Sequence, residues 1–250
     1  MISVLSDMMS YTFIVRAMIV GGLVALCSAL LGVSLVLKRY SMIGDGLSHV
    51  AFAALTIAVA MNVAPLYIST PIVTVAAIIL LRLSENSKIK GDSAIALIST
   101  VSIAIGVVVT ALTKGMNTDV YSYMFGSILA MSESDVYMSI ALSVVVIILF
   151  VFFYNKIFAV TFDESFAKAT GTKSDAYNMI IAVLTAITIV VGMRIMGTML
   201  ISSLIIFPAL ISMRNFKTFK SVIICSAIVS VVCFFLGIVL SYLYSIPTGA

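Results

Sequence analysis

The chain has 250 residues, of which 62% are hydrophobic and 10% are charged, with a net charge of +4. Soluble domains carry about 25% charged residues, so this composition excludes a water-soluble fold and indicates an integral membrane protein. The basic residues are spread through short gaps between apolar runs, so the net charge does not indicate a nucleic-acid partner. The first 12 residues lack a basic n-region, and the first apolar run is therefore expected to remain as a span.

Eight apolar segments are long enough to cross a membrane, because a crossing helix needs about 20 such residues. The runs are continuous rather than alternating, which excludes a β-barrel. No gap accommodates a soluble domain, so residues 1–250 are expected to form one all-α, polytopic transmembrane domain. The expected helices cover residues 13–37, 43–63, 66–83, 93–113, 136–154, 176–193, 197–213 and 219–244. Pro208 is expected to kink the seventh of them.

The lysines and arginines predict the orientation of the chain. If the gap after the first span and every second gap thereafter are cytosolic, 11 of the 14 basic residues lie on that side. Cytosolic loops are enriched in Lys and Arg, so this assignment places both termini outside.

The outer gap at residues 114–135 is longer than a turn. Its apolar and aromatic middle, residues 120–131, is too short to cross the membrane. It is therefore expected to form a re-entrant or interfacial helix.

The cytosolic gap at residues 155–175 predicts a short helix of its own. Thr161 or Asp163 is a candidate N-cap, and Gly171 is a natural C-terminal stop. Phe162 and Phe166 are four residues apart and so share one face. The residues alone leave two possibilities open: a contact with another protein, or a helix lying among lipid headgroups.

Asp45 and His49 are unusual in so apolar a segment, and His49 is the only histidine of the chain. On a helix they share one face, which offers one oxygen and one nitrogen donor to a metal ion. Zn²⁺ usually takes four ligands and Mn²⁺ prefers more, so a two-fold dimer would complete the site. A self-satisfied pair and a proton relay are the alternatives. Ionisable residues inside spans are costly, which favours a functional role.

The chain carries no recognisable catalytic or nucleotide-binding motif. It contains no H-E-x-x-H, no G-x-S-x-G and no P-loop sequence. We therefore expect a transport protein and not an enzyme. If it pumps, a separate chain hydrolyses ATP.

The stretch KRYSMIGDGLSHVAFA (38–53) resembles the signature of the permease subunits of zinc, manganese and iron ABC importers, the ABC-3 family. Further blocks resemble the family in the same order, over nearly the whole chain. They are YSYMFGSILAMSESDV (121–136), FDESFAKATG (162–171), MGTMLISSLIIFPAL (196–210) and IPTGA (246–250). Family members run on past this last stretch, whereas the sequence ends at Ala250.

The resemblance implies a multi-pass permease of the bacterial cytoplasmic membrane. It is expected to contact membrane lipid and to form a homodimer with a second copy of the chain. Its expected partners are a cytosolic ATPase and an extracellular metal-binding protein. Its expected cargo is manganese, zinc or iron, with no permanently bound cofactor. Asp45 and His49 are the expected metal residues of the translocation path. The expected coupling helix includes Phe162, Asp163, Glu164, Phe166, Ala167 and Gly171.

Three functions compete at this point. The leading hypothesis is the permease of an ATP-driven importer of a divalent transition metal. The second is a proton-coupled secondary cation transporter in which Asp45 and His49 relay protons. The third is an importer of a larger metal chelate or vitamin, with no direct ligands in its pathway.

Overall fold

The structure is a computed structural model that describes residues 8–40, 42–86, 91–113, 126, 133–244, 246 and 248–249. Helices joined by short turns make up the described residues, and no strand occurs among them. The principal helices are α2 (Thr12–Leu37), α3 (Ile43–Ala60), α4 (Pro65–Asn86), α5 (Gly91–Leu112), α7 (Glu133–Phe152), α8 (Tyr154–Phe162), α9 (Glu164–Ala169), α10 (Ser174–Asn215) and α11 (Phe219–Tyr244).

Seven of these helices are long and apolar enough to cross a membrane, and α10 accounts for two crossings. Its 42 residues would extend about 63 Å if straight, twice the hydrocarbon thickness of about 30 Å. Gly197 leaves the helical range with φ 77° and ψ 171°. A Cβ built on Gly192 would lie 2.5 Å from Ile201 Cδ1, although nine residues of straight helix span about 13 Å.

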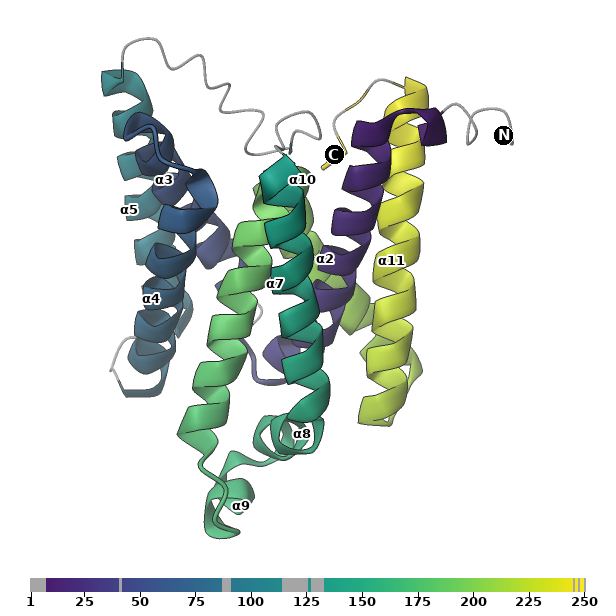
Figure 1. The fold of residues 1–250 in the computed structure, drawn as a ribbon. Coiled ribbons are helices and arrows are strands. Elements are labelled where there is room, and N and C mark those ends of the chain that lie inside the picture. The colour runs from purple at the N-terminus through teal and green to yellow at the C-terminus, as the bar shows by residue number, and fades with distance from the viewer. Residues whose placement is uncertain are drawn as a thin grey trace.

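The chain therefore doubles back at Gly197, and Figure 1 shows α10 rising from α9 and then descending to the start of α11. The two arms correspond to the expected spans 176–193 and 197–213, so the eight expected crossings are all accounted for. The backbone conformation of Gly197 is one that essentially only glycine adopts. Pro208 was expected to kink the span, but Gly197 is the residue of α10 with non-helical angles.

The boundaries near α8 differ from the sequence-based expectation. The fifth span ends at Phe152, and α8 follows at once as a separate helix that is seen end-on below α7 in Figure 1. Most of α8 falls in the expected cytosolic gap at residues 155–175, and its nine residues are too few to cross the membrane. The outer segment expected at 114–135 lies outside the described residues except for Gly126 and the start of α7.

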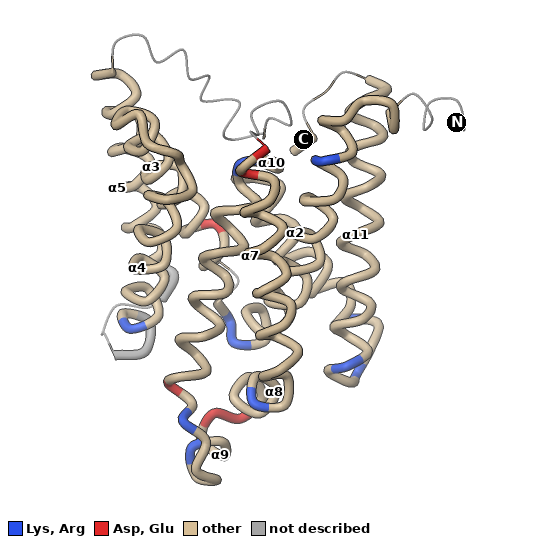
Figure 2. Tube along the Cα trace, viewed as in Figure 1, with Lys and Arg blue, Asp and Glu red and all other residues tan. Residues whose placement is uncertain are grey.

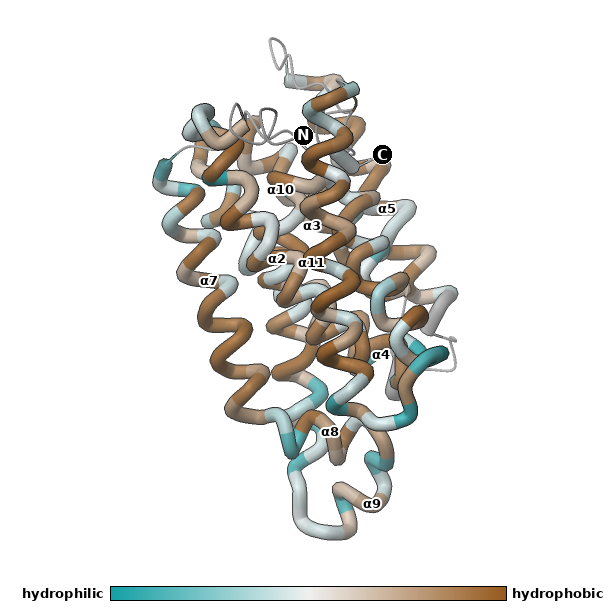
Figure 3. The backbone as a smooth tube through the Cα atoms, turned by 90° about the vertical axis from the view of Figure 1, so that its right-hand side faces the viewer, coloured by the Kyte–Doolittle hydropathy of each residue, from teal (hydrophilic) through white to brown (hydrophobic). Residues whose placement is uncertain are grey.

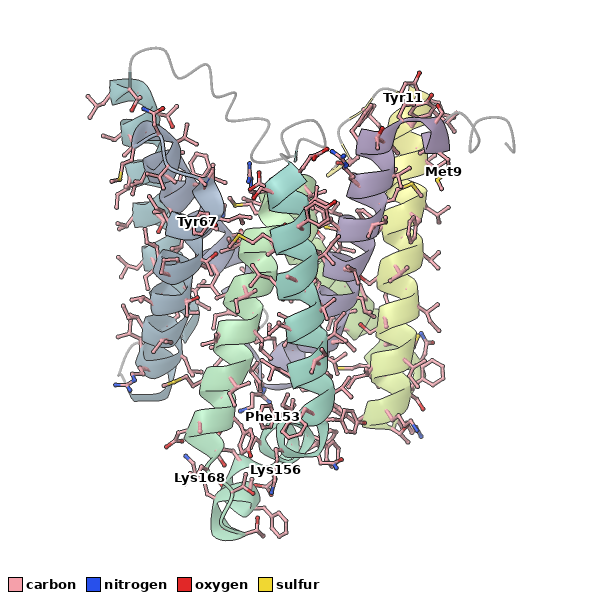
Figure 4. All side chains as sticks on the ribbon, in the orientation of Figure 1. Met9, Tyr11, Tyr67, Phe153, Lys156 and Lys168 are labelled. Carbon is pink, nitrogen blue, oxygen red and sulfur yellow. The ribbon has the colours of Figure 1, made fainter. Side chains whose placement is uncertain are left out.

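Charge divides the bundle into two ends. Most blue segments in Figure 2 gather at the end that carries α8 and α9, opposite the end where both termini lie. Figure 3 shows hydrophobic residues along the middle of the helices and hydrophilic ones towards their ends. In Figure 4, Lys156 and Lys168 lie at the end opposite Tyr11. This distribution agrees with the predicted orientation, with α8 and α9 in the cytosol.

Close approach of backbones holds the centre of the bundle together. The helix α10 packs against α2, α3, α4 and α11. A Cβ on Gly32 of α2 would lie only 2.1 Å from the carbonyl oxygen of Ile205 in α10. Ser230 of α11 donates a hydrogen bond of 2.8 Å to the carbonyl oxygen of Ala25 in α2. Small residues and hydroxyls of this kind drive association between membrane helices.

Substitution of Gly32 by alanine should destabilise the bundle, because the added methyl group collides with backbone that cannot move aside. We expect a cost of about 1–3 kcal/mol, measured as a lower thermal unfolding midpoint in detergent. Gly237→Ala is the matched control, because a Cβ there meets nothing closer than Thr248 O at 4.0 Å. Equal midpoints for the two variants would contradict the described packing of α2 on α10.

Candidate metal site and cytosolic coupling helix

Asp45 and His49 lie side by side near the start of α3. Asp45 occupies the first turn, where a carboxylate interacts favourably with the helix dipole. One turn later, His49 Nε2 lies 3.6 Å from Asp45 Oδ2. This separation is longer than a good hydrogen bond, so both groups keep lone pairs for another ligand.

The Asp45–His49 face is open, whereas the rest of this part of α3 is buried. The side chains of Asp45 and His49 are 43% and 23% exposed. Behind them, Gly44 packs against Ile205 of α10, and Gly46 packs against Ile95 of α5. An ionisable pair on the open face of a membrane-crossing helix cannot face lipid without a large cost, so this face requires water, a cargo ion or a partner.

One chain offers too few ligands for a metal ion at this place. Ser48, which adjoins the pair, donates its hydroxyl to the carbonyl oxygen of Asp45 at 2.7 Å. Within the part of the chain that the structure describes, no group of three or more His, Cys, Asp or Glu side chains could hold a metal ion. The described part of one chain therefore offers two such side chains at this place, Asp45 and His49.

The expected cytosolic helix is present as α9, and its ends are defined by hydrogen bonds. The carboxylate of Asp163 accepts a bond of 2.9 Å from Phe166 N–H, so Asp163 and not Thr161 is the N-cap. At the other end, Gly171 has φ 82° and donates its N–H to Lys168 O at 3.0 Å. Such left-handed glycine caps are a common way to end a helix. The helix is shorter than the expected 162–171.

Two aromatic side chains of this region are exposed to the cytosol. Phe162, the last residue of α8, is 58% exposed, and Phe166 of α9 is 65% exposed. Ala167, which follows Phe166 in α9, is buried. The Phe162 ring also lies 4.9 Å, centroid to centroid, from Phe158 of α8. In Figure 1, α9 projects beyond the ends of the crossing helices. An exposed apolar surface on a projecting element is typical of a protein contact.

Glu164 connects α9 to the bundle. Its Oε2 accepts a hydrogen bond of 3.2 Å from Lys38 Nζ at the end of α2 and another of 3.2 Å from Asn178 Nδ2 in α10. Its Oε1 lies 3.1 Å from Lys168 Nζ, which is also 3.0 Å from an oxygen of Asp175. Lys38 and Asn178 could not be predicted as partners of Glu164 from the sequence, because contacts across 126 and 14 residues leave no periodic signal.

Partial burial by itself raises the pKa of Glu164. Hydrogen bonds from Asn178 and Lys168 and the charge of Lys38 outweigh this effect, so the pKa of the carboxyl lies below its ordinary value of 4.5. Because the pKa of Glu164 is lower in the folded protein than in the unfolded chain, its contacts contribute their full stabilisation at pH values above 4.5. This stabilisation is lost as the pH falls through the lower, folded-state pKa. The contacts of Glu164 are therefore intact at neutral pH.

These features define a polytopic membrane protein with a short helix that projects from the end rich in Lys and Arg. Residues 10–250 match the ABC 3 transport family, and the chain belongs to that family. It is a multi-pass protein of the plasma membrane and a transport subunit, with ATP hydrolysis carried out by a separate subunit. Membership implies an ATPase and a substrate-binding protein as partners.

Three relatives extend over most of the chain. A probable metal transport system membrane protein of Treponema pallidum is 30% identical, covering 97% of this chain and 91% of the relative. The manganese transport system membrane protein MntC of Halalkalibacterium halodurans is 25% identical, covering 98% and 84%. The high-affinity zinc uptake system membrane protein ZnuB of Haemophilus influenzae is 28% identical, covering 93% and 89%.

A solved structure has the same fold. The structure of PsaBC from Streptococcus pneumoniae in complex with Fab matches with a TM-score of 0.88 and 26% identity, covering 100% of this chain and 90% of the other. The described arrangement of the crossing helices is therefore shared with that solved structure.

Replacement of Asp163 by alanine should loosen α9 and leave the crossing helices intact. The variant loses the acceptor of the Phe166 N–H, which costs about 1 kcal/mol of local helix stability. Hydrogen exchange should therefore become faster for the α9 amides alone. Asp163→Asn is the matched control, because asparagine is an equally good N-cap. Unchanged exchange in Asp163→Ala would show that the cap does not hold α9.

Proposed function

We propose that this permease moves a divalent transition metal ion into the cytosol and that Asp45 and His49 of two copies bind the ion on its way. The observation that carries the proposal is the partly exposed Asp45–His49 pair on a membrane-crossing helix. Carboxylate oxygen and imidazole nitrogen are ligands that Zn²⁺ and Mn²⁺ accept. The pair faces away from the core of its own chain.

A second copy related by a two-fold axis would complete the coordination sphere. Two copies contribute two carboxylates and two imidazoles to an ion on the axis, which matches the four ligands usual for Zn²⁺. Two-fold dimers are the commonest symmetric assemblies of proteins. The lack of a third metal-binding side chain among the described residues of one chain supports a shared site.

The cargo class follows from the donors and the relatives. MntC is named as a manganese transporter and ZnuB as a zinc transporter, and both align over nearly the full chain. Iron(II) accepts the same donors, and intrinsic affinity favours zinc over manganese. We therefore propose a divalent transition metal ion as the cargo. The carboxylate and imidazole donors suit manganese, zinc and iron(II) alike.

Transport then follows an alternating-access cycle. An extracellular binding protein delivers the ion, the paired Asp45 and His49 side chains coordinate it, and ATP binding closes the two ATPase subunits. The exposed Phe162 and Phe166 dock α9 onto the ATPase, so that this closure moves the helix. The cycle uses binding energy at α9 to shift the bundle between an outward-open and an inward-open state.

The two alternative functions explain fewer of the observations. A proton-coupled transporter needs no cytosolic docking helix, yet α9 projects from the bundle, with Phe166 and the adjoining Phe162 of α8 exposed. An importer of a large chelate needs no direct ligands, yet the Asp45–His49 pair is placed on the open face of α3. The metal importer accounts for both features.

Replacement of His49 by alanine should abolish metal uptake by vesicles that contain the full transporter. The variant removes two of the four proposed ligands from a dimer, while the side chain is partly exposed and supports little of the core. Expression and association with the ATPase should therefore persist. Acidification should also weaken metal binding to the unsubstituted protein, because a protonated imidazole cannot coordinate.

Thr56→Val is the matched control on the same helix. The Thr56 hydroxyl bonds only the carbonyl oxygen of Ala53 within α3, so uptake should remain close to that of the unsubstituted protein. Undiminished uptake by a folded His49→Ala variant would rule out the proposed ligand role.

A further inference from the structure

A nearly buried ammonium group lies at the cytosolic end of α2. The side chain of Lys38 is only 8% exposed. Its Nζ donates to Glu164 Oε2 at 3.2 Å and, more closely, to Asn178 Oδ1. Asn178 Nδ2 in turn donates to the same Glu164 oxygen at 3.2 Å. The three side chains thus close a triangle of hydrogen bonds, which we call the Lys38 triad.

The triad joins three elements that are distant in sequence. Lys38 is the C-cap of α2, Glu164 lies in the first turn of α9, and Asn178 lies in the second turn of α10. One carboxylate oxygen therefore connects the projecting helix to both crossing helices at their cytosolic ends. A movement of α9 acts directly on Lys38.

Lys38 is also the residue from which the chain turns into α3. Asp45 follows it by seven residues, and the turn between them is closed by backbone hydrogen bonds. Tyr40 N–H donates to Leu35 O at 2.8 Å, and Ile43 N–H donates to Tyr40 O at 3.0 Å. These bonds tie Tyr40 to the end of α2 and the start of α3 to Tyr40, and Asp45 lies in the first turn of α3.

Burial makes the triad stiff. The Lys38 side chain is 8% exposed and that of Glu164 is 36% exposed, so water competes less for this contact than for a fully exposed pair, and its loss at the buried ammonium is unfavourable. Lys38 and Glu164 therefore move together instead of separating. Lys168, which contacts the other oxygen of Glu164, is 51% exposed, and its partner Asp175 is 79% exposed. Water readily replaces that outer contact, so it transmits little force.

We propose that the Lys38 triad is the mechanical link by which α9 positions the start of α3 and hence the metal ligands. This inference rests on the proposed function, and it assigns to Lys38 and Asn178 a positioning role without contact to the ion. When the ATPase displaces α9, Glu164 carries Lys38 with it, and the turn into α3 shifts Asp45 relative to its counterpart. Substitutions in the triad uncouple ATP hydrolysis from transport.

The test uses the complete transporter, with ATPase and binding protein, reconstituted in liposomes. Lys38→Met and Glu164→Gln remove one charge each, and Glu164→Gln keeps the shape of the side chain. ATP hydrolysis and uptake of Mn²⁺ or Zn²⁺ are measured together, and their ratio gives ions moved per ATP. We expect both variants to lower this ratio about tenfold or more, because the contact between the nearly buried Lys38 ammonium and Glu164 is lost. Lys168→Met is the matched control and should keep the ratio of the unsubstituted complex.

A double variant separates transmission from folding. Lys38→Met combined with Glu164→Gln removes the nearly buried ammonium together with its carboxylate partner, so its thermal midpoint should recover towards that of the unsubstituted protein while the ratio stays low. Recovery of both quantities would show that the triad only stabilises the fold and would overturn the inference. A normal ratio in Lys38→Met or Glu164→Gln would overturn it as well. Failure of the unsubstituted complex to move metal would instead contradict the proposed function.

Discussion

The lack of water inside a bilayer governs every part of this molecule. Polar groups there must find partners within the protein, because an unsatisfied group costs several kcal/mol. Most of the chain complies: hydroxyls in the crossing helices donate to backbone carbonyls, such as Ser230 to Ala25 O. Asp45 and His49 differ from these hydroxyls, because they are ionisable and partly exposed on a crossing helix. On this ground we proposed that a cargo ion, water or a second copy of the chain contacts them.

The same constraint separates two kinds of charge at the cytosolic end. Exposed pairs such as Lys168 with Asp175 contribute little, because water competes for both groups. Lys38 is nearly buried and cannot lose its carboxylate without a large penalty. A series of hydrogen bonds therefore connects Glu164 of α9 to Lys38, which ends α2, and Tyr40 then links the end of α2 to the start of α3. In our proposal, the ATPase acts at one end of this series of contacts and the metal ion binds at the other.

Much of the architecture follows from the sequence, because hydropathy and helix-capping signals are local. The eight crossings, the Asp163 cap and the Gly171 stop all depend on a few neighbouring residues, and the structure confirms them. The break in α10 falls at Gly197 and not at Pro208, because the reversal needs a backbone conformation reserved for glycine, which hydropathy does not report. The partners of Glu164 come from α2 and α10, and only tertiary packing brings them together. The spacing of Asp45 and His49 predicted a shared face, but not that this face lies open.

The metal content of the purified complex tests the central claim most directly. The permease dimer with its ATPase would be equilibrated with Mn²⁺ or Zn²⁺, freed of loosely bound ions and measured by elemental mass spectrometry. A site shared by two copies requires one ion for every two permease chains, and no ion when Asp45 is replaced by alanine. One ion per chain, or binding that survives Asp45→Ala, would contradict the shared Asp45–His49 site.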